Sequence, residues 1–190
     1  SSNTLTSIDI KTLKLDYESP LWGGAVGTGL KVALVNTNNG FEFYDIIDDI
    51  PILNTDQSNT FDYDENVNAA YLTYKKQWTK IGIHAGTRIE HTTSKGELTS
   101  LTPENGETVS QEYIDLFPSG GVSYQLNTKN AFSLNYSKRI DRPGYQDLNP
   151  FEFKLDELTY QKGNPFLKPQ YSNSVQLSHT YNYTLNTTLS

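Results

Sequence analysis

The sequence predicts an all-β fold: an antiparallel up-and-down meander that is part of a large transmembrane β-barrel, with alternating short turns and long loops. Three observations lead to this prediction. Segments in which apolar and polar residues alternate recur along the chain, whereas helical periodicity is scarce. Short and long connections between these segments follow each other in strict order. Tyrosine is abundant, with 13 residues against no cysteine and no methionine. Its apolar ring and polar tip suit a boundary between hydrocarbon and water, although tyrosine is also a good strand former.

Seven alternating segments are predicted as strands, and an eighth begins near Asn186. One face of each segment is apolar, and the other carries charged, amide, hydroxyl or small side chains. Such a strand must cover its apolar face with a second sheet or with lipid. The apolar faces are Leu13, Leu15 and Tyr17; Leu30, Val32 and Leu34; Ala70, Leu72 and Tyr74; Ile81, Ile83, Ala85, Thr87 and Ile89; Val122, Tyr124 and Leu126; Phe132, Leu134 and Tyr136; and Val175, Leu177, His179 and Tyr181.

The connections favour lipid over a second sheet. Alternate connections of a meander lie at the same edge, so the tight turns are expected at one edge and the long loops at the other. This asymmetry is typical of bacterial outer-membrane barrels, as are strands of about ten residues. Three aromatic residues at or near tight turns, Trp22, Trp78 and Tyr183, are predicted to lie at a membrane interface. The tight turns are residues 78–80, 127–130 and 182–184, and the long polar connections are about 36–65, 93–111 and 140–172.

Composition excludes several classes of function. The formal charge of −7 argues against a nucleic-acid partner, because a surface that follows phosphates is basic. The absence of cysteine removes disulfides, thiolate catalysis and Cys-ligated zinc. No catalytic arrangement stands out, and the glycine-rich residues 23–29 do not lead into a helix, so we expect no enzyme and no phosphate site. The mean hydropathy of −0.58 does not exclude a barrel, whose strands alternate in polarity.

Metal sites are not expected, with one exception left open. His84 and His91 are seven residues apart on one strand and therefore face opposite sides of it. Carboxylates in or beside the first long loop could bind calcium, but they lack the spacing of an EF-hand, and solvated loop charge is the commoner explanation. These carboxylates belong to Asp45, Asp48, Asp49, Asp56, Asp62, Asp64 and Glu65.

Two stretches carry a resemblance to a known family. Residues 136–151 read YSKRIDRPGYQDLNPF, and residues 163–171 read GNPFLKPQY. Together they resemble the outer membrane β-barrel family close to the TonB-dependent receptors, of the type found in Bacteroidetes. Residues 61–71, 86–92 and 116–119 also fit that family. The resemblance implies the bacterial outer membrane, and a single barrel segment over residues 1–190 from the C-terminal half of a barrel that holds a plug domain elsewhere.

The resemblance also implies a function. Receptors of this kind bind a bulky nutrient, such as an iron chelate, a cobalamin or a glycan, and import it with energy from the TonB complex. The expected partners are therefore outer-membrane lipid, a bulky small-molecule or glycan ligand, and the TonB complex through other regions of the protein.

The loop that contains the two motifs is the candidate ligand site. Its prolines stiffen it, so it could fold over the barrel mouth and contact ligand. The candidate residues are Arg139, Arg142, Tyr145, Asn149 and Asn164. The competing explanation is structural, with Arg139 and Arg142 paired to acidic neighbours: Asp141, Asp147 or Glu152.

Two other functions remain open at this level. One is a barrel that serves as a surface adhesin without transport. The other is a soluble β-sandwich that binds carbohydrate, in which a second sheet would cover the apolar faces. A segment isolated from its barrel could also close on itself or pair with a second molecule through its open edges.

Overall fold

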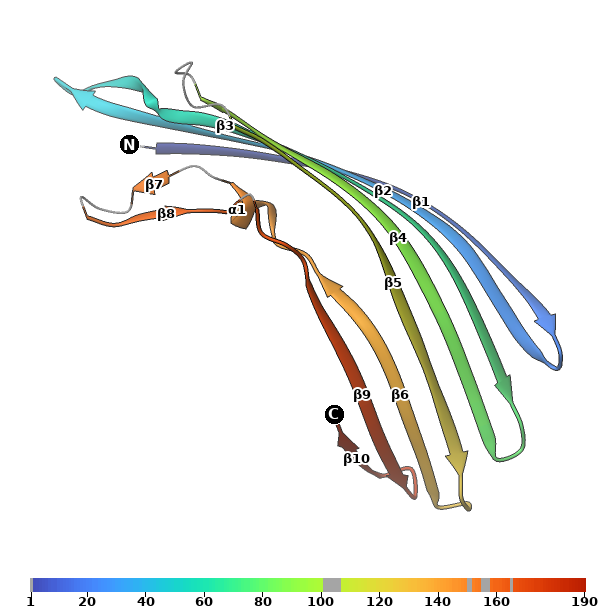
Figure 1. The fold of residues 1–190 in the computed structure, drawn as a ribbon. Coiled ribbons are helices and arrows are strands. Elements are labelled where there is room, and N and C mark those ends of the chain that lie inside the picture. Colours follow the sequence, from blue (N-terminus) through green and yellow to red (C-terminus); the bar gives the residue numbers. More distant parts are fainter. Residues whose placement is uncertain (1, 101–106, 150–151, 155–157, 165) are drawn as a thin grey trace.

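The computed structural model describes residues 2–100, 107–149, 152–154, 158–164 and 166–190. Eight strands form one antiparallel sheet in the order β1-β2-β3-β4-β5-β6-β9-β10 (Figure 1). Its strands are β1 (Ser2–Leu21), β2 (Gly24–Ile47), β3 (Ile50–Gln77), β4 (Ile81–Ser100), β5 (Glu107–Gln125), β6 (Asn130–Asp141), β9 (Gln170–Tyr181) and β10 (Leu185–Leu189). Between β6 and β9 lie the short helix α1 (Tyr145–Leu148) and a two-stranded sheet of β7 (Glu152–Lys154) and β8 (Tyr160–Lys162).

The predicted up-and-down meander is confirmed, because neighbours in the sheet are also neighbours in the chain apart from the β7–β8 excursion. The sheet is strongly curved, and the turns of four strand pairs (β1–β2, β3–β4, β5–β6 and β9–β10) lie together at one edge, at the lower right of Figure 1. The opposite edge holds the ends of β4 and β6 and also a two-residue turn, Asp48 and Asp49, between β2 and β3, so the predicted strict alternation of short and long connections is wrong at that turn. No helix in the described part of the chain is long and apolar enough to cross a membrane.

Two of the predicted long loops are largely strand. The segment expected as a loop over residues 36–65 continues β2 to Ile47 and β3 from Ile50, with only Asp48 and Asp49 between them. Likewise β4 runs to Ser100 and β5 begins at Glu107. Side chains that pair across the strands replace the missing apolar face: the amide of Asn36 donates to Asp64, and that of Asn38 donates to Asp62. The five strands β1 to β5 are therefore 19 to 28 residues long rather than about ten.

Pro118 ends the pairing between β5 and β6. The amide of Gln125 donates towards β4 and that of Leu126 towards β6, so even-numbered amides of β5 face β6. The register to β4 has no shift along β5, so this rule extends to Pro118, which has no N–H. The ladder between β5 and β6 runs from Gln125 with Ala131 to Ser119 with Ser137 and ends there, next to Pro118. Beyond that point β6 separates from β5 and leads into the segment that carries α1 (Figure 1).

The two faces of the sheet differ in chemistry. The predicted apolar residues share one face, since Leu13 pairs with Val32 and Leu15 with Leu30 in register. Their side chains are largely exposed, with Leu13 at 74% and Leu15 at 68%. No second sheet covers this face among the described residues. A β-sandwich would require such a sheet, whereas lipid would cover the apolar face of a membrane barrel. On β4 the apolar band spans residues 81–89, about 30 Å of strand, which suits a tilted strand crossing a bilayer.

Candidate functional site

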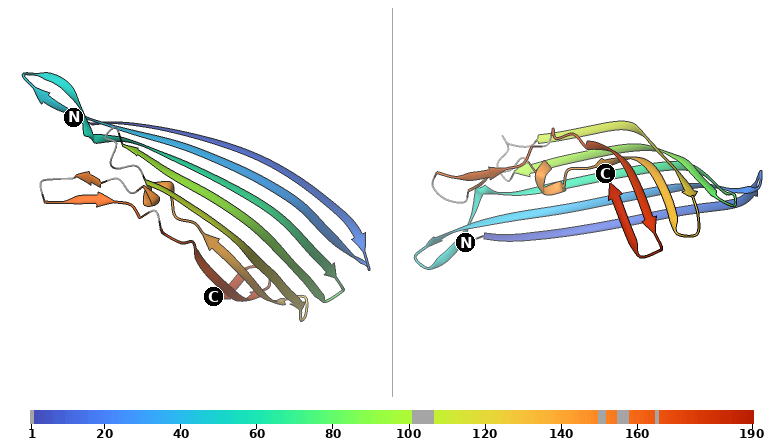
Figure 2. Two further views of the ribbon diagram at one scale, coloured as in Figure 1. Left: turned by 45° about the horizontal axis from the view of Figure 1, so that its top comes forward. Right: turned by 90° about the horizontal axis from the view of Figure 1, so that it is seen from below.

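Between β6 and β9, the described residues 142–149, 152–154, 158–164 and 166–169 lie on the concave side of the sheet near its long-loop edge (Figure 2). We call these residues the inner loop. Leu148 of α1 is buried against Phe61 of β3 and Leu98 of β4, with Tyr63 beside them. This small cluster is the hydrophobic core of the described chain, and it holds the inner loop on the wall of the sheet.

Arg142 fixes the start of the inner loop to the sheet. Its Nη2 donates to Glu90 Oε2 at 2.7 Å and to Thr92 Oγ1 at 3.1 Å, and its Nε donates to Tyr113 Oη at 3.2 Å. Glu90 is buried on β4, and its other carboxylate oxygen accepts from Arg88 Nε at 2.9 Å. A buried carboxylate is costly unless it is paired, so two guanidinium groups sharing Glu90 make this anchor stable and specific in geometry.

Two titratable groups of this region are shifted by their contacts. Burial lowers the pKa of Arg142, but hydrogen bonds to Glu90 and Tyr113 outweigh burial and raise it above its usual range. Arg142 therefore stays charged at any physiological pH. Burial and a hydrogen bond to Asp115 raise the pKa of Tyr171 to about 12, and its hydroxyl donates to Asp115 at 2.8 Å. This hydrogen bond joins β9 directly to β5, beyond the point where the ladder between β5 and β6 ends.

The two halves of the family motif meet inside the inner loop. Gly163 N donates to Asn149 O at 2.9 Å, and Asn164 N donates to Asp147 O at 2.7 Å. A Cβ at position 163 would lie 2.4 Å from Asn149 O and 2.7 Å from Asp147 O, so only glycine allows this approach. The Asn164 side chain then accepts from Phe166 N at 2.9 Å and shapes the turn that follows.

A cavity of about 480 Å³ lies between the inner loop and the sheet. One wall comes from the concave face of β1 and β2, with Thr4, Asn39 and Phe41. The opposite wall comes from the inner loop and is lined by Asp147, Asn149, Gln161, Lys162, Gly163, Asn164 and Leu167. Most of these side chains are polar, and amides predominate among them.

The structure brings some of the predicted ligand residues together and not others. Asn149 and Asn164 both line this cavity. Arg142 lies behind the inner loop as its anchor, and Arg139 is exposed on β6. Tyr145 begins α1, but its side chain lies outside the described residues.

The predicted acidic partners were wrong for Arg142. It pairs with Glu90 and not with Asp141 or Asp147, and the side chain of Glu152 lies outside the described residues. Asp147 instead accepts from Gly144 N at 3.0 Å within the loop. Acidic residues close to Arg142 in the sequence were the expected partners. The curved sheet instead brings Glu90 of β4, 52 positions earlier in the chain, within reach of the inner loop.

Sequence reasoning missed the residues contributed by the wall. Glu90, Thr92 and Tyr113 hold Arg142, and Asn39 lines the cavity. The one available signal was the family-like stretch at residues 86–92, which contains Glu90 and Thr92. Nothing in the polar residues around Asn39 distinguished them from loop.

The three predicted interface aromatics lie at the tight-turn edge. Trp22 and Tyr183 occupy turns and Trp78 follows β3, all at the same edge of the sheet. Trp22 and Tyr183 have φ of 48° and 57°, in the left-handed region that bulky residues rarely adopt. Lys76 donates to Trp22 O at 2.6 Å, and its ammonium lies 4.9 Å from the Trp78 ring. This arrangement is what an aromatic girdle requires, although the position of the bilayer remains a prediction.

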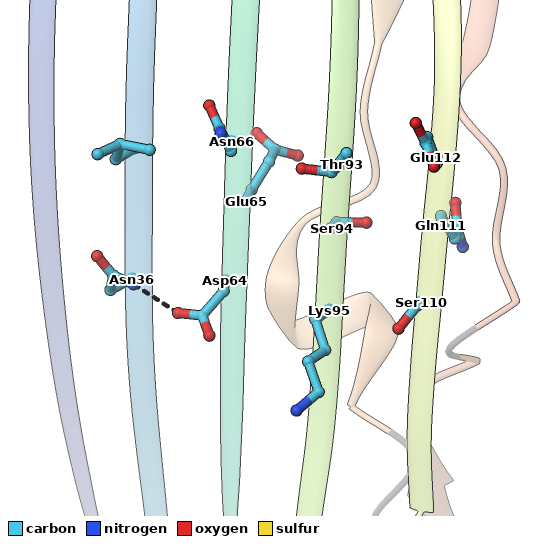
Figure 3. A pocket seen from close by; sticks show the side chains of 11 residues that line it. Asn36, Asp64, Glu65, Asn66, Thr93, Ser94, Lys95, Ser110, Gln111 and Glu112 are labelled. Carbon is cyan, nitrogen blue, oxygen red and sulfur yellow. Dashed lines mark hydrogen bonds between the residues drawn. The ribbon is translucent and has the colours of Figure 1, made fainter.

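The outer face carries a polar groove beyond the apolar band (Figure 3). Asn36, Asp64, Thr93, Lys95 and Glu112 project into it from four neighbouring strands, and Asn36 donates to Asp64. The acidic residues suggested for calcium are dispersed along β2 and β3 and the turn between them. Over the described ranges no three His, Asp or Glu side chains gather as metal ligands would.

The two histidines of β4 face opposite sides, as their spacing predicts. His84 pairs in register with Gly121 and lies on the concave face, like Glu90. His91 lies on the outer face just beyond Ile89, and its Nε2 is 2.8 Å from Glu112 Oε1. Neither histidine belongs to the inner-loop cavity.

A curved antiparallel sheet with a lipid-compatible outer band, a polar concave face and tight turns at one edge is the wall of an outer-membrane β-barrel. The model of the Outer membrane protein beta-barrel family matches residues 1–190, and the chain belongs to that family. Its location is the bacterial outer membrane. A sequence comparison with curated proteins gives no match.

One similar solved structure is the crystal structure of the ferric yersiniabactin uptake receptor FyuA from Yersinia pestis. The TM-score is 0.65 at 16% sequence identity, and the match covers 95% of this chain. It covers only 27% of the receptor, so the chain spans about a quarter of that protein's length. At this identity the likeness concerns the fold, and it shows that the same eight-stranded arrangement occurs within the wall of a receptor.

Proposed function

We propose that this chain is part of the barrel of an outer-membrane receptor that imports a bulky nutrient: an iron chelate, a cobalamin or a glycan. The observation that carries the proposal is the inner loop, which is anchored on the concave face by Arg142 and encloses a polar cavity there. A barrel that only formed a wall would not need a polar cavity of this kind on its concave face. The fold shared with an uptake receptor supports the same reading.

The proposed mechanism is capture followed by passage, without covalent chemistry. The long connections outside the membrane meet the ligand first, because tight turns mark the periplasmic edge of such barrels. The inner loop then contacts the ligand at the barrel mouth. By the family resemblance, release into the periplasm is energised by the TonB complex, acting through regions of the protein beyond this chain.

Uptake by cells tests this proposal directly. Cells that produce the protein at its native length are compared with a strain that lacks it, using ferric chelates, cyanocobalamin and labelled oligosaccharides. We expect protein-dependent accumulation of one of these ligands, abolished by a protonophore that dissipates the proton gradient. Accumulation of none of them above the deletion strain would contradict import of these three ligand classes.

The second candidate function is surface adhesion without transport, and the β2–β3 hairpin favours it. This hairpin projects beyond the long-loop edge of the sheet (Figure 1), and Ile46, Ile47, Ile50 and Ile52 are exposed at its tip. Exposed apolar residues in such a place are typical of contact surfaces. Loss of cell adhesion in an Ile46→Ser/Ile50→Ser variant, with no uptake of the three ligand classes, would favour the adhesin.

A further inference from the structure

The cavity under the inner loop is lined by an unusual concentration of amides. Asn39 contributes from β2, Gln161 from β8, and Asn149 and Asn164 from the segments that follow α1 and β8. A side-chain amide has an NH2 group that donates and an oxygen that accepts, which suits a hydroxyl group. The oxygen of Asn39 already accepts from Thr6 Oγ1 at 2.8 Å, and that of Asn164 accepts from Phe166 N, so these two residues meet a ligand chiefly with their NH2 donors. Residues from three separate parts of the chain thus present complementary groups to one space.

The charge of the lining selects among ligands. Among the described residues of the lining, Asp147 and Lys162 are the two charged ones, and their formal charges cancel. A polyanionic chelate or a phosphate group would be recognised by several cationic side chains, with arginine preferred for its paired donors. Arg142 is close in sequence but is engaged by Glu90, Thr92 and Tyr113 behind the loop. The cavity is therefore suited to an uncharged, hydroxyl-rich molecule.

The sheet side of the cavity adds an apolar surface and an unsatisfied amide nearby. Phe41 lines the cavity and can cover the C–H face of a ring. Its register partner on β3, Asn59, is 4% exposed, and neither amide atom has a hydrogen-bond partner among the described residues. Asn59 is not among the residues that line the cavity, so the apolar surface of Phe41 is the contribution of this part of the sheet to the site.

We propose that the inner-loop cavity is a binding site for a neutral saccharide, held by Asn39 and Gln161 from opposite walls. The inference rests on the proposed function and narrows its ligand to the glycan class. A volume of about 480 Å³ lies within the range of small-ligand sites, so the cavity holds a short part of a longer chain. The open polar mouth of the barrel leaves room for the rest.

The test measures binding of neutral hexasaccharides to the native-length protein purified in detergent micelles. Maltohexaose, cellohexaose, xylohexaose and mannohexaose are titrated by calorimetry. The variants are Asn39→Leu on the sheet and Gln161→Ala on the inner loop. Asn38→Ala is the matched control, because Asn38 is the neighbouring amide on the opposite face, bonded to Asp62. Retention of the heat-dependent shift in gel mobility verifies that each variant barrel is folded.

We expect at least one hexasaccharide to bind, with Kd raised about fivefold by each variant and unchanged in the control, since each removes about one hydrogen bond. Binding of none of the four, or binding that neither variant weakens, would overturn the saccharide site. Energy-dependent uptake of cyanocobalamin or a ferric chelate in place of sugar would overturn it while leaving the proposed import function intact.

Discussion

Replacing Arg142 by glutamine should release the inner loop from the sheet. Arg142→Gln removes the 2.7 Å ion pair with Glu90 and the bonds to Thr92 and Tyr113. Breaking a buried pair costs about 3 to 5 kcal/mol when it leaves a charge unpaired. Glu90 keeps its contact with Arg88, which is half-exposed, so the cost falls at or below the low end of that range. We expect about 2 to 3 kcal/mol, which is also the upper part of the range for hydrogen bonds to charged groups.

Hydrogen exchange of the inner loop measures this cost, because local opening exposes specific amides. The amides of Gly163 and Asn164 are protected by bonds to Asn149 and Asp147. A loss of about 2 to 3 kcal/mol raises their exchange rate by about 30-fold to 140-fold. Mass spectrometry on peptides covering residues 158–167 reads that change in the native-length protein, with peptides of β3 and β4 as internal references.

A matched control separates the anchor from surface charge. Lys95 and Glu97 form an ion pair of the same 2.7 Å length, but both side chains are about half-exposed on the outer face. Lys95→Gln should leave exchange in the inner loop unchanged, since exposed pairs contribute at most about 1 kcal/mol. Unchanged protection of Gly163 and Asn164 in Arg142→Gln, with the reference peptides also unchanged, would refute the anchoring role.

Three further predictions follow from other parts of the fold. Gly163→Ala should open the junction between the two motif stretches, since the new Cβ would meet two backbone oxygens, and it should raise hydrogen exchange of residues 158–167. Gly144→Ala is the control, because its Cβ would meet only the Asp147 carboxylate, at 3.2 Å. Leu134→Arg should reduce assembled barrel, because arginine near the bilayer midplane costs about 2 to 4 kcal/mol. Ser133→Arg on the opposite face should assemble normally, and equal losses would contradict the assignment of faces. Trp22→Asn should relieve the strain of the left-handed backbone at this position by about 1 kcal/mol. The same variant should reduce the tryptophan fluorescence that lipid brominated at shallow positions quenches, because it removes one of the two tryptophans at the interface. Unchanged quenching would contradict an interfacial Trp22.

The membrane-facing part of the fold was predictable because burial against lipid leaves a period-two pattern. Residues 81–89 and 132–136 were predicted as strands and are strands. Residues 36–47 and 50–65 were predicted as loop because they have no apolar face. Their strands are held by amide–carboxylate pairs such as Asn36 with Asp64 and Asn38 with Asp62, which periodicity in hydropathy does not report.

The position of the candidate site in the sequence was predictable, but its contacts were not. The two motif stretches mark the inner loop, and Asn149 and Asn164 line one cavity there; their contact with a ligand stays a prediction. Glu90 lies 52 positions before Arg142 in the chain, and Asn39 lies 110 positions before Asn149. Their contribution depends on the curvature of the sheet and on the point where β6 leaves β5, which local sequence patterns do not specify.

The place of the inner loop in the chain lets that loop vary without disturbing the membrane-facing wall. Insertions within a strand ladder shift the register of every later pair, and a one-residue slip turns apolar side chains into the lumen. Residues 142–169 lie outside the β5–β6 ladder and outside the β6–β9 ladder, which ends at the pair Asp141 with Gln170, so length changes in this segment leave the register of both ladders unchanged. The inner loop can therefore change in length and sequence while the lipid-facing sheet inserts into the membrane in the same way.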